Sequence, residues 1–327
     1  MNKKLFTGVC CALFAIFFTC AFAELTCAEA SGWPQKPITL LVGYSAGGSS
    51  DLGARFLAQA LEKQLGQPIV VENRPGSVSW VAWNQLLYNT PKDGYTFALV
   101  NLSMIFGAYD AMNPRKETID DFDLLANQAI DYEAVAIRKD ENRFSDFAGL
   151  VEYAQKNDLL VAAAGTGLVA GEATAAKMME KFYGCKITVV PVDGMKDAET
   201  MFISGNTDFL LGTVGDVTLG HKNGEFKAVA LFGEERSTLL PDVPTIKELG
   251  MGDYVQFSAR GYSYAKGVDA EIVAKMKNAL AKAIEDPEHI KRMNDMGVEV
   301  KLYVGDEYRR ILEEQLENRL NIWGVSK

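Results

Sequence analysis

Short apolar runs alternate with segments of helical periodicity along most of the chain. The run from Ile38 to Val42 is typical of a buried strand, and the segment from Asp51 to Leu65 has helical spacing and ends at Gly66. Further strands are expected over 69–72, 96–100, 159–164, 187–190, 208–211 and 228–232, and further helices over 171–183, 269–286 and 306–323. This alternation predicts an α/β protein with parallel strands covered by helices.

Two units share the order strand, glycine-rich turn and helix. They cover residues 38–65 and 159–183. Ligands of open α/β sheets bind beyond the carboxyl ends of the strands, where such turns gather. One unit in each of two domains therefore predicts a ligand cleft between the domains.

The turn of the first unit is rich in small residues. We expect ligand contacts from Ser45, Ala46, Gly47, Gly48, Ser49 and Asp51. Glycine lets a ligand approach the backbone, and the free amides at a helix start favour an anion. The alternative is a plain turn in which Ser50 or Asp51 caps the helix. The spacing fits neither a Walker loop nor a dinucleotide-binding turn.

The turn of the second unit contains Gly165, Thr166 and Gly167. A G-T-G triplet is a weak signal, and it is more often a plain turn than a site. Its position after a strand and before a helix makes it a second candidate for an anion contact, by the same amide argument.

Residues for catalysis or for metal binding are scarce. The chain has two histidines, His221 and His289, and His289 is expected to face solvent at a helix start. Four of the five cysteines lie within the first 27 residues, and the fifth, Cys185, is expected to be buried. We therefore expect no metal, no cofactor and no catalytic nucleophile. The formal net charge of −10 disfavours nucleic acid as a partner.

The amino terminus has the pattern of an export signal. Lys3 and Lys4 precede an uncharged apolar stretch, which two small-x-small triplets ending at Ala23 and Ala30 follow. This order predicts a signal peptide over residues 1–30 and a periplasmic location. A membrane anchor is the alternative, although the stretch is short for one. Lipidation at Cys20 or Cys27 is a weaker alternative, since no small residue directly precedes either cysteine.

Five phrases occur in an order that resembles one protein family. They are WPQKPI (33–38), GQPIVVENRPG (66–76), PKDGYT (91–96), SGNTD (204–208) and LPDVPTIKELG (240–250). The chain resembles the Bug family, the periplasmic substrate-binding component of tripartite tricarboxylate transporters. The resemblance covers nearly the whole chain after the signal.

The resemblance implies a two-lobed type II periplasmic-binding fold, with two mixed sheets flanked by helices. Residues 31–130 and 257–327 would form lobe 1, and residues 131–256 would form lobe 2. The helical carboxyl terminus is expected to return to lobe 1, which gives a hinge of two crossovers near residues 130 and 256.

The resemblance also implies a function. A protein of this kind captures a small organic carboxylate between its lobes and delivers it, as a monomer, to integral membrane transporter subunits. The loops around Gly47 and Thr166 would hold the carboxylate, and Ser103 and Asp216 would line the pocket. A sensory partner of a receptor and an exported enzyme using the same cleft are the alternatives.

Several departures from the family pattern lie at expected pocket rims. Trp80 stands where the family usually has a small or polar residue, so its indole either walls the pocket or lies in the core. Gly171 stands in place of a usual histidine. If Glu172 or Asp193 faces the cleft, it would pair with an ammonium group, and the ligand would be an amino acid.

Overall fold

The computed structural model describes residues 32–77, 79–109, 114–163, 170–192 and 194–326. Pro34–Lys327 form one unit, to which the description below refers. Its strands are β1 (Ile38–Val42), β2 (Ile69–Asn73), β3 (Thr96–Asn101), β4 (Phe122–Arg138), β5 (Asp158–Ala163), β6 (Lys186–Pro191), β7 (Leu210–Thr213), β8 (Phe226–Leu231), β9 (Phe257–Ala265) and β10 (Val300–Val304). Its α-helices are α1 (Ser49–Leu65), α2 (Trp80–Tyr88), α3 (Ser103–Phe106), α4 (Phe147–Lys156), α5 (Gly171–Tyr183), α6 (Met195–Ile203), α7 (Val214–Asn223), α8 (Ala270–Ile284), α9 (Pro287–Asp295) and α10 (Asp306–Trp323).

The larger sheet is mixed, as the resemblance implied, whereas the second sheet is a purely parallel pair. The main strand order is β10-β4-β9-β3-β1-β2, in which β1 is parallel to β2 and β3, whereas β9 is antiparallel to both β3 and β4. Strands β5 and β6 form a separate parallel pair. The parallel strands that the alternating pattern predicted are therefore confirmed for β1–β3 and β5–β6, and the antiparallel pairings of β4 and β9 join these groups.

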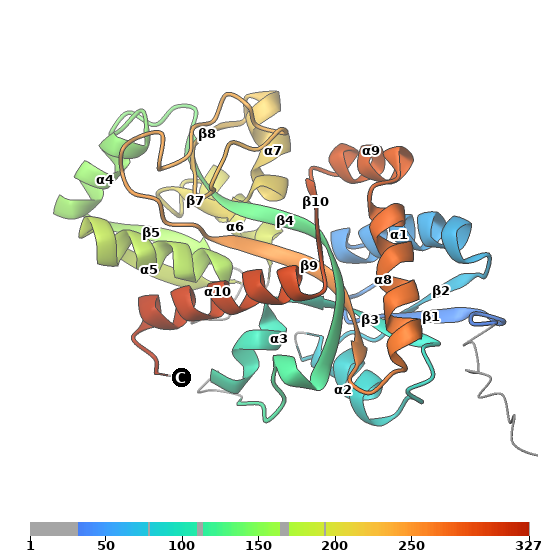
Figure 1. Ribbon diagram of the computed structural model, residues 1–327. Helices are drawn as coiled ribbons and strands as arrows, with labels where there is room; N and C mark the ends of the chain where they lie inside the picture. Colours follow the sequence, from blue (N-terminus) through green and yellow to red (C-terminus); the bar gives the residue numbers. More distant parts are fainter. Residues whose placement is uncertain (1–31, 78, 110–113, 164–169, 193, 327) are drawn as a thin grey trace, which may run out of the picture. The chain divides into compact units, whose positions relative to one another are not determined.

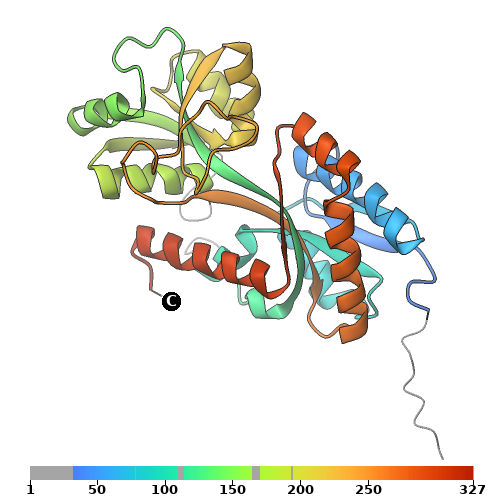
Figure 2. The ribbon, with the colours of Figure 1, turned by 45° about the horizontal axis from the view of Figure 1, so that its top comes forward.

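Strand β4 changes partners halfway along its 17 residues. Its first part, Phe122 to Tyr132, pairs with β9. Its second part, from Glu133 onward, pairs with β7 and β8. Figures 1 and 2 show β4 and β9 running side by side from the elements around α1 to those around α4 and α5. One long strand thus belongs to two groups of strands.

The ends of α1 follow from its sequence. The helix begins after Gly48, buries Leu57 and Leu61 on its apolar side, and ends at Gly66, whose φ of 67° is the left-handed conformation that glycine adopts without strain. The helix begins at Ser49, two residues before the predicted start at Asp51. The amino end of α1 therefore directly follows the glycine-rich loop.

His289 contradicts its prediction. It was expected to face solvent, but its side chain is only 2% exposed, and its Nε2 lies 3.1 Å from the Gln128 amide nitrogen. Asp286 caps α9 as the sequence indicated, and the face of α9 that carries His289 packs toward α1. Cys185 is buried, as expected.

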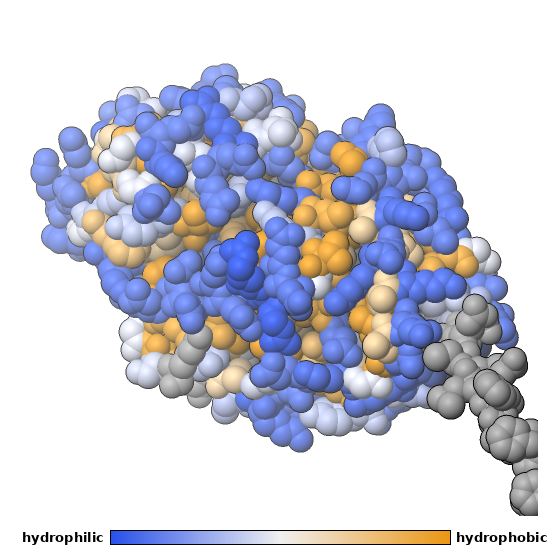
Figure 3. All heavy atoms as spheres, in the orientation of Figure 1, coloured by the Kyte–Doolittle hydropathy of each residue, from blue (hydrophilic) through white to orange (hydrophobic). Residues whose placement is uncertain are grey.

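Hydrophilic side chains cover most of the face seen in Figure 3, and an apolar patch lies beside β10. Within the described ranges, no helix combines the length and the apolar character needed to cross a membrane.

Candidate functional site

The loop between β1 and α1 presents unpaired helix amides at the surface. Residues 45–49 are exposed. Gly48 occupies the N-cap position of α1, and no side chain in the described part of the chain caps this end. The first amides of a helix have no partner within the helix and lie at the positive end of its dipole. The loop is therefore equipped to bind an anion.

Asp51 holds this loop from beneath. Its carboxylate accepts hydrogen bonds from the Gly47 amide at 2.8 Å, from Asn73 Nδ2 at 2.8 Å and from Arg55 Nε at 3.0 Å. Asn73 also donates to the Tyr44 carbonyl at 2.9 Å, so the contacts tie β2 to both ends of the loop. Burial alone would raise the pKa of Asp51, but the bonds from Arg55, Gly47 and Asn73 bring it below its usual value. With 1% of its surface exposed, Asp51 braces the loop from inside the fold.

The carboxyl ends of β1 and β3 meet at Tyr44. The Asn101 amide donates to the Tyr44 hydroxyl, and its Oδ1 accepts from the Ser103 amide at 3.0 Å. Burial raises the pKa of Tyr44, and the nearby positive charge of Arg260 on β9 opposes this rise. The loop, Ser103 and Arg260 are thus brought to one edge of the strands.

Asp131 lies on β4 beside this edge and is 2% exposed. Its Oδ1 accepts from the Gly215 amide at 3.0 Å, in the first turn of α7, and its Oδ2 lies 3.9 Å from Arg260 Nη2. Burial raises the pKa of Asp131 to about 6; Arg260 opposes the rise, and the Asp216 charge adds to it. A protein carboxylate therefore already occupies the amino end of α7.

Glu133, two residues along β4, lies against the start of α5. A Cβ placed on Gly171 would overlap its Oε1, so only glycine at position 171 leaves room for the carboxyl group. Burial raises the pKa of Glu133 well above its usual value and raises the pKa of Glu172 to about 7. Burial lowers the pKa of Arg319 on α10 to about 10, and the negative charges of Glu133 and Glu172 limit the decrease.

Of the remaining predicted site residues, Asp216 lies at the start of α7 and four others lie outside the described residues. Asp216 caps α7, where its carboxylate accepts from both the amide and the hydroxyl of Thr213 at 2.8 Å. It is exposed, and it adds negative charge beside Asp131 and Glu133. The candidates outside the described residues are Gly165, Thr166, Gly167 and Asp193.

Trp80 is a core residue in this structure. It is 4% exposed and packs edge to face against Trp83 at 5.0 Å between ring centroids, and the Arg115 guanidinium lies 5.2 Å from its ring. Its burial favours the core position over the position in a pocket wall.

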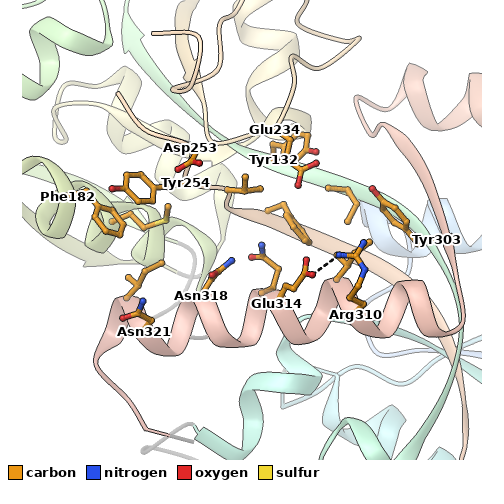
Figure 4. Close-up of a pocket in the computed structure, with 17 residues that line it drawn as sticks. Tyr132, Phe182, Glu234, Asp253, Tyr254, Tyr303, Arg310, Glu314, Asn318 and Asn321 are labelled. Atoms are coloured by element: carbon orange, nitrogen blue, oxygen red, sulfur yellow. Dashed lines mark hydrogen bonds and ion pairs between the residues drawn. The ribbon is translucent and has the colours of Figure 1, made fainter. Parts of the chain in front are cut away.

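A cavity of about 460 Å³ lies on the opposite face of β4. Tyr132, between the two carboxylates in sequence, lines it, because successive side chains of a strand point to opposite faces. In Figure 4, Phe182 and Tyr254 close one end as a stacked pair 3.6 Å apart, and Arg310 pairs with Glu314 at 2.6 Å on α10. The residues predicted to bind the ligand do not line this cavity.

The sequence reasoning missed the contribution of β4 and β9. Asp131, Glu133 and Arg260 belong to no recognisable motif. One signal in the sequence could have identified them. Acidic residues interrupt an otherwise apolar stretch, and acidic side chains are seldom fully buried unless they are paired. In the described ranges, no three histidine, cysteine or acidic side chains are grouped to hold a metal ion.

Comparison with known proteins shows the family to which the chain belongs. Residues 53–323 match the family model described as the Tripartite tricarboxylate transporter family receptor, TctC. A protein of Agrobacterium vitis, from the TAR-I ttuE-ttuC' intergenic region, is 31% identical over 86% of this chain and 81% of its own length. A TctC solute-binding protein from Polaromonas, solved without ligand, superposes with a TM-score of 0.78 at 25% identity, covering 89% of this chain and 99% of that one.

Two further solved structures share the fold and hold ligands. MatC from Rhodopseudomonas palustris, with bound malate, has a TM-score of 0.71 at 23% identity and covers 88% of this chain and 99% of that one. An R. palustris protein with adipate has a TM-score of 0.75 at 22% identity and covers 90% and 99%. The chain therefore has the periplasmic-binding-protein fold and belongs to the TctC family of solute-binding receptors, which are not enzymes.

Proposed function

We propose that the chain binds a small organic carboxylate at the amino end of α1 and delivers it to a membrane transporter. The observation that carries the proposal is the exposed, uncapped start of α1 after a loop that Asp51 braces. A braced loop keeps its amides aimed before the ligand arrives, which reduces the ordering cost of binding. Arg260, near Tyr44, adds a positive charge at the same edge.

The relatives support the chemical class. Malate and adipate, bound by the two R. palustris proteins, are both dicarboxylates. Ser103 lies at the edge formed by Tyr44 and Arg260 and is a candidate contact. Residues 165–167 and Asp216 remain candidates for the contacts from the other side. Trp80 would act only through the packing of the first group of strands.

The proposed lobes divide near the point where β4 changes partners. Residues 31–130 with 257–327 form one lobe in this proposal, and residues 131–256 form the other. The partner change between Tyr132 and Glu133 and the start of β9 at Phe257 support crossovers at these positions. We propose that the lobes close on the ligand by bending there. Small-angle scattering with and without saturating ligand tests this, since an unchanged radius of gyration with binding confirmed contradicts closure.

Export and delivery complete the proposal. The basic and apolar amino terminus would be removed after Ala23 or Ala30, leaving a periplasmic monomer that meets integral membrane subunits. Sequencing the amino terminus of protein recovered from the periplasm tests the export step, and an intact Met1 contradicts it.

Calorimetry with carboxylates and their uncharged amides tests the binding function. Malate, adipate and citrate are titrated into the processed protein, and adipamide serves as the matched neutral control for adipate. We expect at least one acid to bind and its amide to bind at least tenfold more weakly, because the amide cannot accept charge-assisted hydrogen bonds. Absence of binding across a broad panel of mono-, di- and tricarboxylates that includes amino acids would overturn the proposal.

A further inference from the structure

More acidic than basic side chains gather at one face of β4. Asp131, Glu133, Glu172 and Asp216 gather there, and the positive side chains near them are Arg260 and Arg319. When all six are ionised, four negative charges face two positive ones. Asp131 and Glu133 are buried, Glu172 is partly buried and Asp216 is exposed; an excess of one charge is unfavourable where it is shielded from water. The face is therefore prepared for additional positive charge.

Some acidic and some basic side chains at this face also have atoms without a hydrogen-bond partner. Among the described residues, Asp131 Oδ2, Glu133 Oε2 and Arg260 Nη1 are buried and have no hydrogen-bond partner. Asp131 and Glu133 are 2% and 1% exposed. Buried polar atoms in folded proteins nearly always have such partners, so these three atoms are candidates for contacts with another molecule.

The backbone makes room for both carboxylates. A Cβ on Gly171 would overlap Glu133, and a Cβ on Gly215 would lie 2.9 Å from Asp131 Oδ2. The Gly215 amide fixes the other oxygen of Asp131 at 3.0 Å. The two glycines thus leave room for the carboxylates, and Asp131 Oδ2 and Glu133 Oε2 have no partner among the described residues.

We propose that the solute is an amino acid, whose ammonium group binds Asp131 and Glu133 and whose carboxylate binds Arg260 and the start of α1. The proposal rests on the proposed carboxylate-binding function and specifies its ligand. An ammonium group has three donors and no acceptor, which suits two acidic oxygens, and a carboxylate only accepts, which suits an arginine. A plain dicarboxylate would instead place a second negative charge beside four acids.

Matched pairs of ligands test the proposal. Succinate and aspartate, glutarate and glutamate, 4-methylpentanoate and leucine, and 3-phenylpropanoate and phenylalanine differ only in the α-ammonium group. We expect calorimetry to show at least tenfold tighter binding of the amino acid in the pair that fits the pocket. Equal or tighter binding of the plain acid overturns the amino-acid proposal and leaves the carboxylate function intact. Failure of every acid and amino acid overturns both.

Variants locate the ammonium site. Asp131→Asn and Glu133→Gln are expected to reduce the preference for the amino acid to within about threefold of the plain acid, since the carbonyl oxygen of an amide accepts a hydrogen bond but carries no charge. Glu152→Gln, which removes an exposed acid on α4, is the control for net charge and is expected to keep the full preference. Retention of the preference in both site variants overturns the assignment.

A proton measurement serves if the variants fail to fold. An ammonium group beside Asp131 and Glu133 favours their ionised forms, so the wild-type protein releases protons when it binds the amino acid. Titrations at pH 6 in buffers of different ionisation enthalpy measure this release. Binding of the amino acid without proton release contradicts contact between its nitrogen and these carboxylates.

Discussion

Two buried aspartates of this protein, Asp51 and Asp131, differ in the number of hydrogen bonds they accept. Their exposed fractions are 1% and 2%. Asp51 accepts three hydrogen bonds between 2.8 and 3.0 Å, whereas Asp131 accepts one at 3.0 Å and has Arg260 at 3.9 Å. The pKa of Asp51 is lowered and that of Asp131 is raised to about 6. Desolvation raises the pKa of both aspartates, and at Asp51 the hydrogen bonds from Arg55, Gly47 and Asn73 outweigh it, whereas at Asp131 it dominates.

The difference separates a structural carboxylate from one suited to bind a ligand. The contacts of Asp51 are complete within the fold, and they fix the loop that presents the helix amides. Asp131 Oδ2 has no hydrogen-bond partner among the residues that the structure describes. The same substitution, aspartate to asparagine, should therefore have opposite effects at the two positions.

Asp51→Asn is expected to have the largest effect, a loss of about 3 kcal/mol in the free energy of unfolding at pH 7, the scale for breaking a buried charge pair. The amide nitrogen would face the Asn73 donor if it replaced Oδ1, or the donors of Gly47 and Arg55 if it replaced Oδ2. Urea denaturation measures the loss, and the loosened loop should also weaken ligand binding. Glu152→Gln is the control. A loss below about 1 kcal/mol would contradict the bracing role.

Asp131→Asn is expected to stabilise the ligand-free protein by about 2 kcal/mol at pH 7. The sign follows from the raised pKa: stability from the protonated carboxyl is present below pH 3.8 and is lost as the pH rises toward about 6. The full pKa shift of Asp131 corresponds to a loss of about 3 kcal/mol in the free energy of unfolding. The gain in the variant is smaller, because the Gly215 amide makes a weaker hydrogen bond to asparagine than to a carboxylate. Urea denaturation at pH 7 and pH 3.5 should show the gain only at the higher pH. Destabilisation at pH 7 would mean that Arg260 satisfies Asp131 in solution.

His289 extends the comparison to a buried base. Burial lowers its pKa to about 4, against the opposing effects of the Phe56 backbone and Asp286. A lowered histidine pKa gives stability above pH 6.5 that is lost as the pH falls toward 4, by about 2 kcal/mol at pH 5. Because Asp131 changes stability in the opposite direction over this range, the measurement is the difference between the wild type and His289→Gln at pH 7 and pH 5. An equal difference at both values would contradict burial of the neutral ring.

Local turn chemistry made the first part of the site predictable. Glycines and serines between a strand and a helix indicate a helix start with close ligand approach, and the loop at 43–48 has that form. The sequence did not reveal that Asp51 points inward, because a first-turn acid looks the same whether it caps, braces or binds.

The central strand was harder to predict. Residues 122–138 are buried on both faces, which removes the alternation that identifies a half-buried strand. Asp131 and Glu133 therefore lie in a segment for which the sequence pattern predicted no strand or helix. The prediction for His289 was wrong for a related reason. The capping pattern of Asp286 fixes where α9 starts, but it does not indicate which face of the helix packs on its neighbours. Pairing between β4 and β9 decides the first question, and packing of α9 against α1 and Gln128 decides the second.

The smallest expected effects compare two neighbouring glycines of the loop. Gly47 has a φ of 86° and an added Cβ would meet no atom within 4 Å, so Gly47→Ala should cost only the backbone strain of about 1 kcal/mol. Gly48 has a φ of −75°, and its Cβ would lie 3.6 Å from the Ser45 carbonyl oxygen, an ordinary contact. Gly48→Ala should therefore leave stability unchanged. Urea denaturation of both variants measures their free energies of unfolding. A loss in Gly47→Ala alone would come from backbone strain, and a loss in Gly48→Ala would indicate a steric clash.

Ligand binding by the same pair tests the position of the anion site. Both methyl groups would project at an exposed helix start, so both variants should bind the acid at least tenfold more weakly, although only Gly47→Ala is destabilised. Calorimetry at pH 7 with the best acid of the panel gives the affinities. Full affinity in the stable Gly48→Ala protein would place the carboxylate away from the start of α1. The charged face of β4, with Arg260, would then be the principal site, and Asp51 would brace a loop that does not touch the ligand.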